Sequence, residues 1–148
     1  MMIQPYLDFF LRDLDKVKEE LLLYKNENDL WTVKGDIQNA AGTLTLHLIG
    51  NLKHFIGAQI GFTGYIRNRD KEFSDRNISR EKLISEVEEV ISIVKKVLPT
   101  IKDEDFSKEF PVEMYGARRT TGYILLSLST HFCYHLGQIN YHRRLLAY

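Results

Sequence analysis

The stretch THFCYHLGQINYHRRLL (residues 130–146) decides the fold we expect, because its apolar residues recur every three or four positions. If residues 121–146 form one α-helix, a single face carries Leu125, Leu128, Phe132, Ile139 and Leu146. The same face carries three histidines, His131, His135 and His142. A helix of this length must bury its apolar face against other helices, so the stretch favours a helical bundle.

Three more segments show helical periodicity, at about residues 5–24, 39–62 and from Ser79 to just before Pro99. Ser79 is a plausible N-cap, and the glycines of the second segment permit close packing. Four such helices predict an all-α four-helix bundle that forms one domain over residues 1–148. Two long connections argue against the simplest up-down-up-down order, and residues 106–121 can pair as a short hairpin.

Composition excludes several classes of function. Twenty basic and twenty acidic residues give a formal net charge of zero, which argues against nucleic-acid or anionic-membrane partners. The sequence has no uncharged apolar run of about 18 residues and no secretory signal pattern, so we expect no membrane association. The single cysteine, Cys133, excludes an intrachain disulfide framework and fits a reducing compartment, so we expect a cytoplasmic protein.

The histidines define the candidate site. His131 and His135 lie one helical turn apart, so both rings can lean toward one point, as in zinc-binding helices. His47 and His54 are about 10 Å apart along the second helix, too far to share one ion easily, and the same holds for His135 and His142. The economical site therefore combines His131 and His135 with one histidine of the second helix. The alternative is that these histidines are hydrogen-bonded core residues.

Three neutral imidazoles leave a fourth metal position for water or substrate, which is the pattern of a reactive zinc site. Nickel, cobalt or ferrous iron accept the same ligands. A di-iron bundle is not expected, because the inward Glu-x-x-His pairs are missing. A zincin is not expected either, because Phe132 follows His131 where that motif places its glutamate.

TLTLHLIGNL (residues 43–52) and THFCYHLGQINYHRRLL (residues 130–146) resemble the DinB-like family of metal-binding four-helix bundles. The resemblance covers nearly the whole chain, and its most specific part is one histidine in the second helix with His-x-x-x-His in the last. It implies an up-down-down-up topology, a homodimer, and a divalent metal, zinc or nickel, held by His47, His131 and His135. His54 is the substitute for His47.

Characterised members of the family include thiol-dependent S-transferases and a maleylpyruvate isomerase, so the resemblance implies a small-molecule substrate such as a low-molecular-weight thiol. A metal-dependent hydrolase is an alternative that prefers a nearby carboxylate, for which the loop candidates are Asp36, Asp70 and Glu72. A non-catalytic metal- or ligand-binding dimer is another. In a further alternative the loop RNRDKEF (residues 67–73) binds an anion through its charged residues Arg67, Arg69, Asp70 and Glu72.

Four other residues carry smaller predictions. Gln138 and Asn51 lie one turn from His135 and His47, where each can orient a ligand ring or bond to other neighbours. Cys133 is about 200° around the helix from His131 and is expected to be a small packing residue. Trp31 is expected to anchor the first connection against the bundle.

Overall fold

The computed structural model describes residues 1–146 as a bundle of four long helices. These are α1 (Ile3–Leu23), α2 (Ala41–Leu52), α4 (Arg80–Val97) and α5 (Thr121–Leu146), and a short helix, α3 (Arg69–Ser74), joins them. Shorter turns are η1 (Glu27–Trp31), η2 (Lys53–Ala58), η3 (Leu98–Thr100) and η4 (Asp103–Ser107). Residues 1–146 contain no β-strand, which confirms the predicted all-α class.

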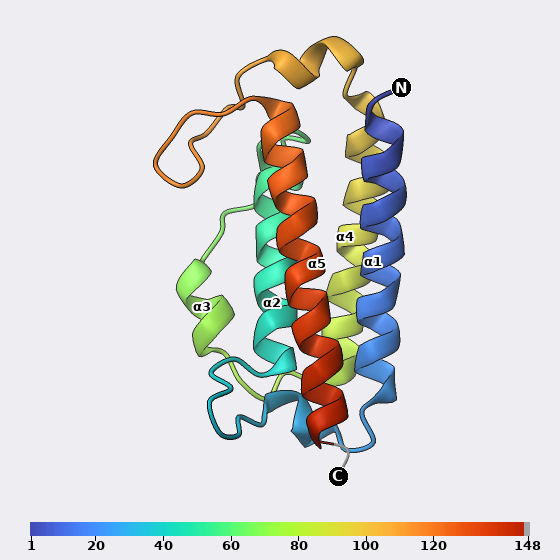
Figure 1. The fold of residues 1–148 in the computed structure, drawn as a ribbon, viewed down its shortest axis with the longest axis vertical. Helices are drawn as coiled ribbons and strands as arrows, with labels where there is room; N and C mark the ends of the chain where they lie inside the picture. Colours follow the sequence, from blue (N-terminus) through green and yellow to red (C-terminus); the bar gives the residue numbers. More distant parts are fainter. Residues whose placement is uncertain (147–148) are drawn as a thin grey trace.

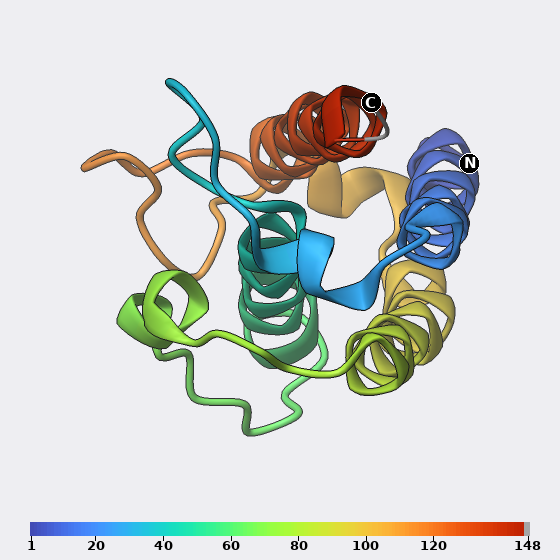
Figure 2. The same ribbon diagram turned by 90° about the horizontal axis from the view of Figure 1, so that it is seen from below.

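The long helices run in two directions. In Figure 1, α1 and α5 run downward and α2 and α4 run upward. The connection from α2 to α4, which includes α3, lies along one side of the bundle, and the connection from α4 to α5 crosses its upper end. Seen end-on in Figure 2, α1, α2, α4 and α5 surround the core, and α3 stands outside them against α2. The segment between α2 and α4 therefore lies over the outer side of α2.

Burial follows the apolar periodicity of each helix. In α4 the buried side chains step by three or four residues, at Leu83, Val87, Val90, Val94 and Val97. Helix α2 differs, because all of its residues except Leu46 are buried or nearly so. A polar side chain on α2 is thus enclosed by protein, and it needs a partner to offset the loss of water.

The ends of the helices follow local signals in the sequence. The Ser79 hydroxyl accepts a hydrogen bond from the Lys82 backbone N–H at 3.1 Å, which is the predicted N-cap of α4. The second helix is shorter than expected: its α-helical part ends at Leu52 and one π-helical turn follows. The chain then leaves the helix where Phe62 (φ 52°) and Gly64 (φ 78°) adopt left-handed backbone conformations.

Two connections have defined contacts. Trp31 anchors the first one as predicted: its indole N–H donates to the Ile78 carbonyl at 3.2 Å, and its ring lies against Gly42. The expected hairpin before α5 is present only as two isolated β-bridges, Glu109 with Thr120 and Met114 with Ala117. This loop projects beside α2 and α5 in Figure 1, and it places Met114 at one edge of the site described next.

Candidate metal centre

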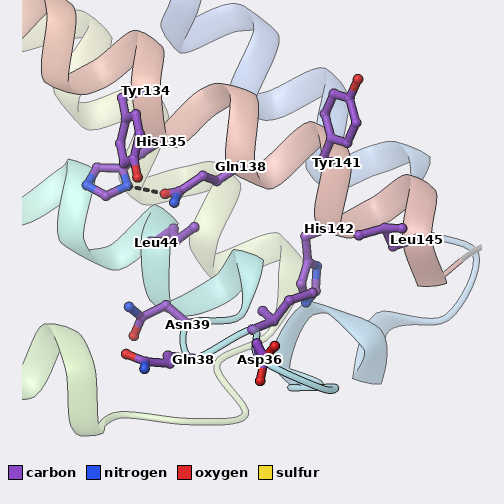
Figure 3. A pocket seen from close by; sticks show the side chains of 11 residues that line it. Asp36, Gln38, Asn39, Leu44, Tyr134, His135, Gln138, Tyr141, His142 and Leu145 are labelled. Carbon is purple, nitrogen blue, oxygen red and sulfur yellow. Dashed lines mark hydrogen bonds between the residues drawn. The ribbon is translucent and has the colours of Figure 1, made fainter.

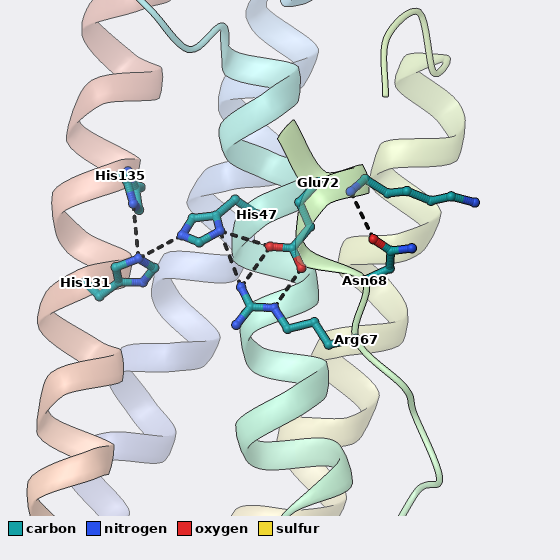
Figure 4. Close-up of polar contacts among 7 residues, drawn as sticks. His47, Arg67, Asn68, Glu72, His131 and His135 are labelled. Atoms are coloured by element: carbon teal, nitrogen blue, oxygen red, sulfur yellow. Dashed lines mark hydrogen bonds and ion pairs between the residues drawn. The ribbon is translucent and has the colours of Figure 1, made fainter. Parts of the chain in front are cut away.

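Three imidazole rings meet between α2 and α5. The Nε2 atom of His131 lies 3.0 Å from Nε2 of His47 and 3.1 Å from Nε2 of His135 (Figure 4). One ligand nitrogen from each of the three residues lies within 4.8 Å of the others. The structure therefore brings together the histidines that the sequence singled out, and the group can hold a metal ion.

Two of the rings are held through their other nitrogen. Nδ1 of His47 donates to the Glu72 carboxylate at 3.0 Å, and Nδ1 of His135 donates to Oε1 of Gln138 at 2.7 Å. A carboxylate only accepts hydrogen bonds, so the proton of neutral His47 resides on Nδ1 and its Nε2 carries a lone pair. The same logic gives His135 a lone pair on Nε2. Both rings are thus in the tautomer that binds a cation through Nε2.

His131 completes the group and carries its least satisfied atom. Its Nδ1 is buried and has no hydrogen-bond partner in the described part of the chain. Burial is the main cause that lowers the pKa of His131 to about 4, and the nearby His135, His47, Arg67 and Arg69 contribute to the same shift. Burial also lowers the pKa of His135. Both rings are therefore neutral near pH 7, as ligands must be.

The spacing of the nitrogens suits a metal. Zinc–nitrogen bonds are about 2.0–2.1 Å long, which separates the nitrogens of a tetrahedral site by about 3.3 Å. Two of the three separations, 3.0 and 3.1 Å from Nε2 of His131, are close to that value, and all three lie within 4.8 Å. Without a shared cation, the single proton of neutral His131 can occupy only one of its two nitrogens. On Nε2 it separates the lone pairs of His47 and His135 but leaves the buried Nδ1 without a donor. On Nδ1 it leaves three Nε2 lone pairs facing one another. The donor set therefore fits a divalent ion.

Glu72 is the residue that sequence reasoning did not place. It is 6 % exposed, and Arg67 holds both of its oxygens, Nε to Oε2 and Nη2 to Oε1, each at 2.8 Å (Figure 4). Burial favours a higher pKa for Glu72, but the hydrogen bonds from Arg67 and His47 outweigh it and hold the pKa below its usual value. The carboxylate is thus ionised, and as an acceptor it fixes the orientation of the His47 ring.

A glycine makes room for Glu72. A Cβ at Gly50, one turn after His47 on α2, would lie 2.6 Å from Cδ of Glu72 and closer still to Oε2. Because only a residue without a side chain fits there, the loop can fold back over α2 and deliver its carboxylate. The sequence suggested close packing at this glycine but not the partner.

The remaining histidines lie outside the group. His142 is 3 % exposed; its Nδ1 accepts from the Tyr24 hydroxyl at 2.6 Å and its Nε2 donates to the Thr32 carbonyl at 2.7 Å. It is therefore the hydrogen-bonded core histidine of the alternative interpretation. His54 lies in the π-helical turn with its ring edge-on to Phe55. Neither contributes a nitrogen to the cluster.

The predicted neighbours of the ligands fare differently. Gln138 does bond to His135, but as an exposed residue rather than a buried amide. Asn51 does not reach His47: its Oδ1 is buried without a partner, and Glu72 occupies the ring nitrogen instead. The prediction that Cys133 is a packing residue was wrong, because it is exposed and its thiol donates to the buried Asp13 carboxylate at 3.0 Å.

Two cavities border the histidines. The larger, about 540 Å³, is lined among others by Asp36, His135, Gln138 and His142. In Figure 3 His135 presents its Nδ1 edge to Gln138, and its other nitrogen points away from this cavity. A smaller cavity of about 200 Å³ is lined by two of the three rings, His47 and His131. The smaller cavity is thus the better route to the convergent nitrogens.

Fold and site together define a helical bundle with a three-histidine cluster held between its second and last long helices. The chain belongs to the family described as "Protein of unknown function (DUF1572)", which matches residues 4–147. It is similar in structure to a DinB-like protein, YjoA, from Bacillus subtilis. That likeness has a TM-score of 0.68 and covers 98 % of this chain and 93 % of the other, at 14 % sequence identity.

The likeness to YjoA confirms the predicted DinB-like resemblance at the level of the fold. No curated protein matches the chain by sequence, so no activity comes from that comparison. Within residues 1–146, no helix combines the length and apolar character that crossing a membrane requires.

Proposed function

We propose that this DinB-like protein binds a divalent metal ion, zinc or nickel, through His47, His131 and His135, and that it transfers a low-molecular-weight thiol to an electrophilic substrate. The observation that carries the proposal is the convergence of the three Nε2 atoms, with His131 at 3.0 and 3.1 Å from its two neighbours. Neutral rings, two of them fixed by hydrogen bonds at Nδ1, are prepared for a cation before it arrives.

The chemistry follows from an open position beside three neutral ligands. A divalent cation held by His47, His131 and His135 would lower the pKa of a thiol and so would supply a nucleophilic sulfur at neutral pH. In the overall reaction the thiol proton passes to solvent, a sulfur–carbon bond forms, and the leaving group departs with the electron pair of the broken bond. Glu72 and Gln138 keep the rings of His47 and His135 oriented throughout.

Thiol transfer is favoured over hydrolysis because the three loop carboxylates considered from the sequence are poorly suited to activate water. Both oxygens of Glu72 accept hydrogen bonds from Arg67 and His47. Asp70 is exposed on α3, and Asp36 lines the other cavity. A transfer that starts from a thiol needs no protein base, so it makes the smaller demand on this site.

We also propose that the protein is a cytoplasmic homodimer that acts on a small molecule. Support for the dimer comes from α5, where an exposed row of large apolar side chains comprises Tyr123, Leu126, Tyr134, Tyr141 and Leu145. A row of this kind on one helix is typical of an association surface. Sedimentation equilibrium of the purified protein measures the state, and a monomer at high protein concentration contradicts it.

Elemental analysis tests the metal. Protein purified after loading with zinc or nickel should hold an equimolar amount of metal, and His131→Ala should lose it because the central nitrogen is gone. His54→Ala is the matched control, since His54 lies outside the cluster and its loss should leave the metal content unchanged. If wild type, His131→Ala and His54→Ala all hold the same substoichiometric amount of metal, the proposed metal site is wrong.

A panel of thiols and electrophiles tests the reaction. Zinc-, nickel- and manganese-loaded protein should accelerate the loss of free thiol for at least one pair, and His131→Ala should not. Rates that equal the protein-free background throughout the panel overturn the transferase and leave a binding protein.

A further inference from the structure

The smaller cavity carries charges that the metal cluster does not use. Besides His47 and His131 it is lined by Asn51, Arg67, Arg69 and Glu113. Arg67 is committed to Glu72, so its charge is balanced. No ion pair within 4.0 Å joins Arg69 or Glu113 to any other residue of the described chain. One cation and one anion thus border the same space without an ion-pair partner among the described residues.

Arg69 is held in place near the rings. Its guanidinium lies 4.9 Å from the centre of the Phe73 ring, and the same ring packs 4.9 Å from the centre of His47. An arginine that stacks on an aromatic face keeps its N–H groups free at the edge, where they can bind a carboxylate. Arg69 and His131 line the same cavity, which places the positive charge beside the cluster.

Asn51 adds an acceptor from the interior. Asn51 is 7 % exposed. Its side-chain carbonyl oxygen, Oδ1, has no hydrogen-bond partner within residues 1–146. A buried carbonyl oxygen without a donor costs about 1–3 kcal/mol, so a ligand N–H that reached it would be bound favourably. Asn51 and Glu113 are both acceptors on the cavity wall, opposite in character to Arg69.

We propose that this cavity binds the zwitterionic amino-acid group of a small thiol: Arg69 pairs with its carboxylate, and Glu113 and Asn51 receive its ammonium group. The inference rests on the proposed function, which places the sulfur at the histidine cluster. A volume of about 200 Å³ suits a ligand of this size, since pockets for drug-sized molecules measure about 300–1,000 Å³. The preferred thiol is therefore an amino acid or a short derivative with both charges free.

Cobalt-loaded protein and four thiols test the inference. The probes are L-cysteine, cysteamine without the carboxylate, 3-mercaptopropionate without the ammonium group, and 2-mercaptoethanol with neither. Binding is followed through sulfur-to-cobalt charge-transfer absorption, with cobalt content checked after each titration. Each charged contact is expected to tighten binding by about tenfold, the lower end for hydrogen bonds to charged groups.

Substitutions at two exposed residues test the carboxylate contact and the ammonium contact separately. Arg69→Gln should weaken L-cysteine and 3-mercaptopropionate about tenfold and leave cysteamine unchanged. Glu113→Gln should weaken L-cysteine and cysteamine by a similar factor and leave 3-mercaptopropionate unchanged. Circular dichroism and the urea midpoint of each variant should match wild type, because neither side chain has an ion-pair partner to lose in residues 1–146.

The outcomes distinguish the two proposals. If the four thiols bind alike, or if L-cysteine keeps its advantage in both variants, the zwitterion subsite is wrong while thiol binding at the cluster stands. An advantage that survives both substitutions would come from chelation of the cobalt itself. If no thiol produces the charge-transfer band, the proposed function and the subsite fail together.

Discussion

Replacing Gly50 with alanine tests how the site is built, because the new methyl group would strike the residue that orients His47. The methyl would lie 2.6 Å from Cδ of Glu72 and closer still to Oε2, whereas ordinary contacts begin at 3.4 Å, so the carboxyl must retreat from α2 by at least about 0.8 Å. The His47–Glu72 hydrogen bond of 3.0 Å would lengthen to about 3.8 Å and be lost. Loss of such an outer partner lowers metal affinity by about 10–100-fold.

Stability should fall at the same time. Alanine is favoured over glycine within a helix by about 1 kcal/mol, but a broken buried ion pair costs about 3–5 kcal/mol. The pair at risk is Arg67–Glu72, whose side chains are 14 % and 6 % exposed. We therefore expect Gly50→Ala to lower the free energy of unfolding by about 2–4 kcal/mol. Chelator competition measures the zinc affinity, and urea unfolding measures the stability.

Gly137→Ala is the matched control. It is the same substitution within a helix, but a Cβ at Gly137 meets nothing within 4 Å. We expect wild-type zinc affinity and a gain of up to about 1 kcal/mol in stability. If Gly50→Ala binds zinc as tightly as wild type, Glu72 does not support the site in the way we infer.

Three further predictions follow from the same contacts. Glu72→Gln should weaken zinc binding about 10–100-fold in chelator competition, while Glu86→Gln, at a half-buried carboxylate that pairs with Lys53, should not; equal losses in both would contradict the role of Glu72. In metal-free protein the folded pKa of His131, about 4, lies below its ordinary value of 6.5. The folded chain then binds fewer protons than the unfolded chain, so urea unfolding should show stability falling as the pH drops from about 6.5 to about 4. His131→Ala should make that decline shallower, and an unchanged slope would refute the assignment. Tyr24→Phe leaves Nδ1 of buried His142 without its donor and should cost about 1–3 kcal/mol in urea unfolding, with zinc affinity unchanged; a loss of zinc affinity would show that His142 belongs to the site.

The fold was predictable because it depends on local patterns. The apolar periodicity gave the last helix its observed bounds of Thr121–Leu146, and the capping serine gave the start of α4. The error in the second helix has a local cause as well. Nearly every residue there is apolar or small, so the pattern does not reveal where α-helical hydrogen bonding gives way to a π-helical turn.

The candidate site was predictable only where one helix carries the signal. The i, i+4 spacing brings His131 and His135 together in any α-helix, whereas the choice of His47 over His54 came from the family resemblance. Glu72 was one of three loop carboxylates considered for a hydrolase, but its bond to His47 was out of reach, because it stands 25 residues after His47 and meets it through a loop that folds back over α2. The adjacent Asn51 was the nearer candidate along the chain, but it has no partner for its Oδ1.

His47 and His131 are separated by 84 positions in the sequence, and α4 lies between them along the chain. A cation bound by both His47 and His131 would act as a reversible cross-link, because it would close a large loop of the chain as a disulfide does. At a free concentration of about 1,000 times its dissociation constant, it would add about 4.1 kcal/mol to a domain whose total stability is typically about 5–15 kcal/mol. Metal starvation would then appear first as faster proteolytic turnover of the polypeptide.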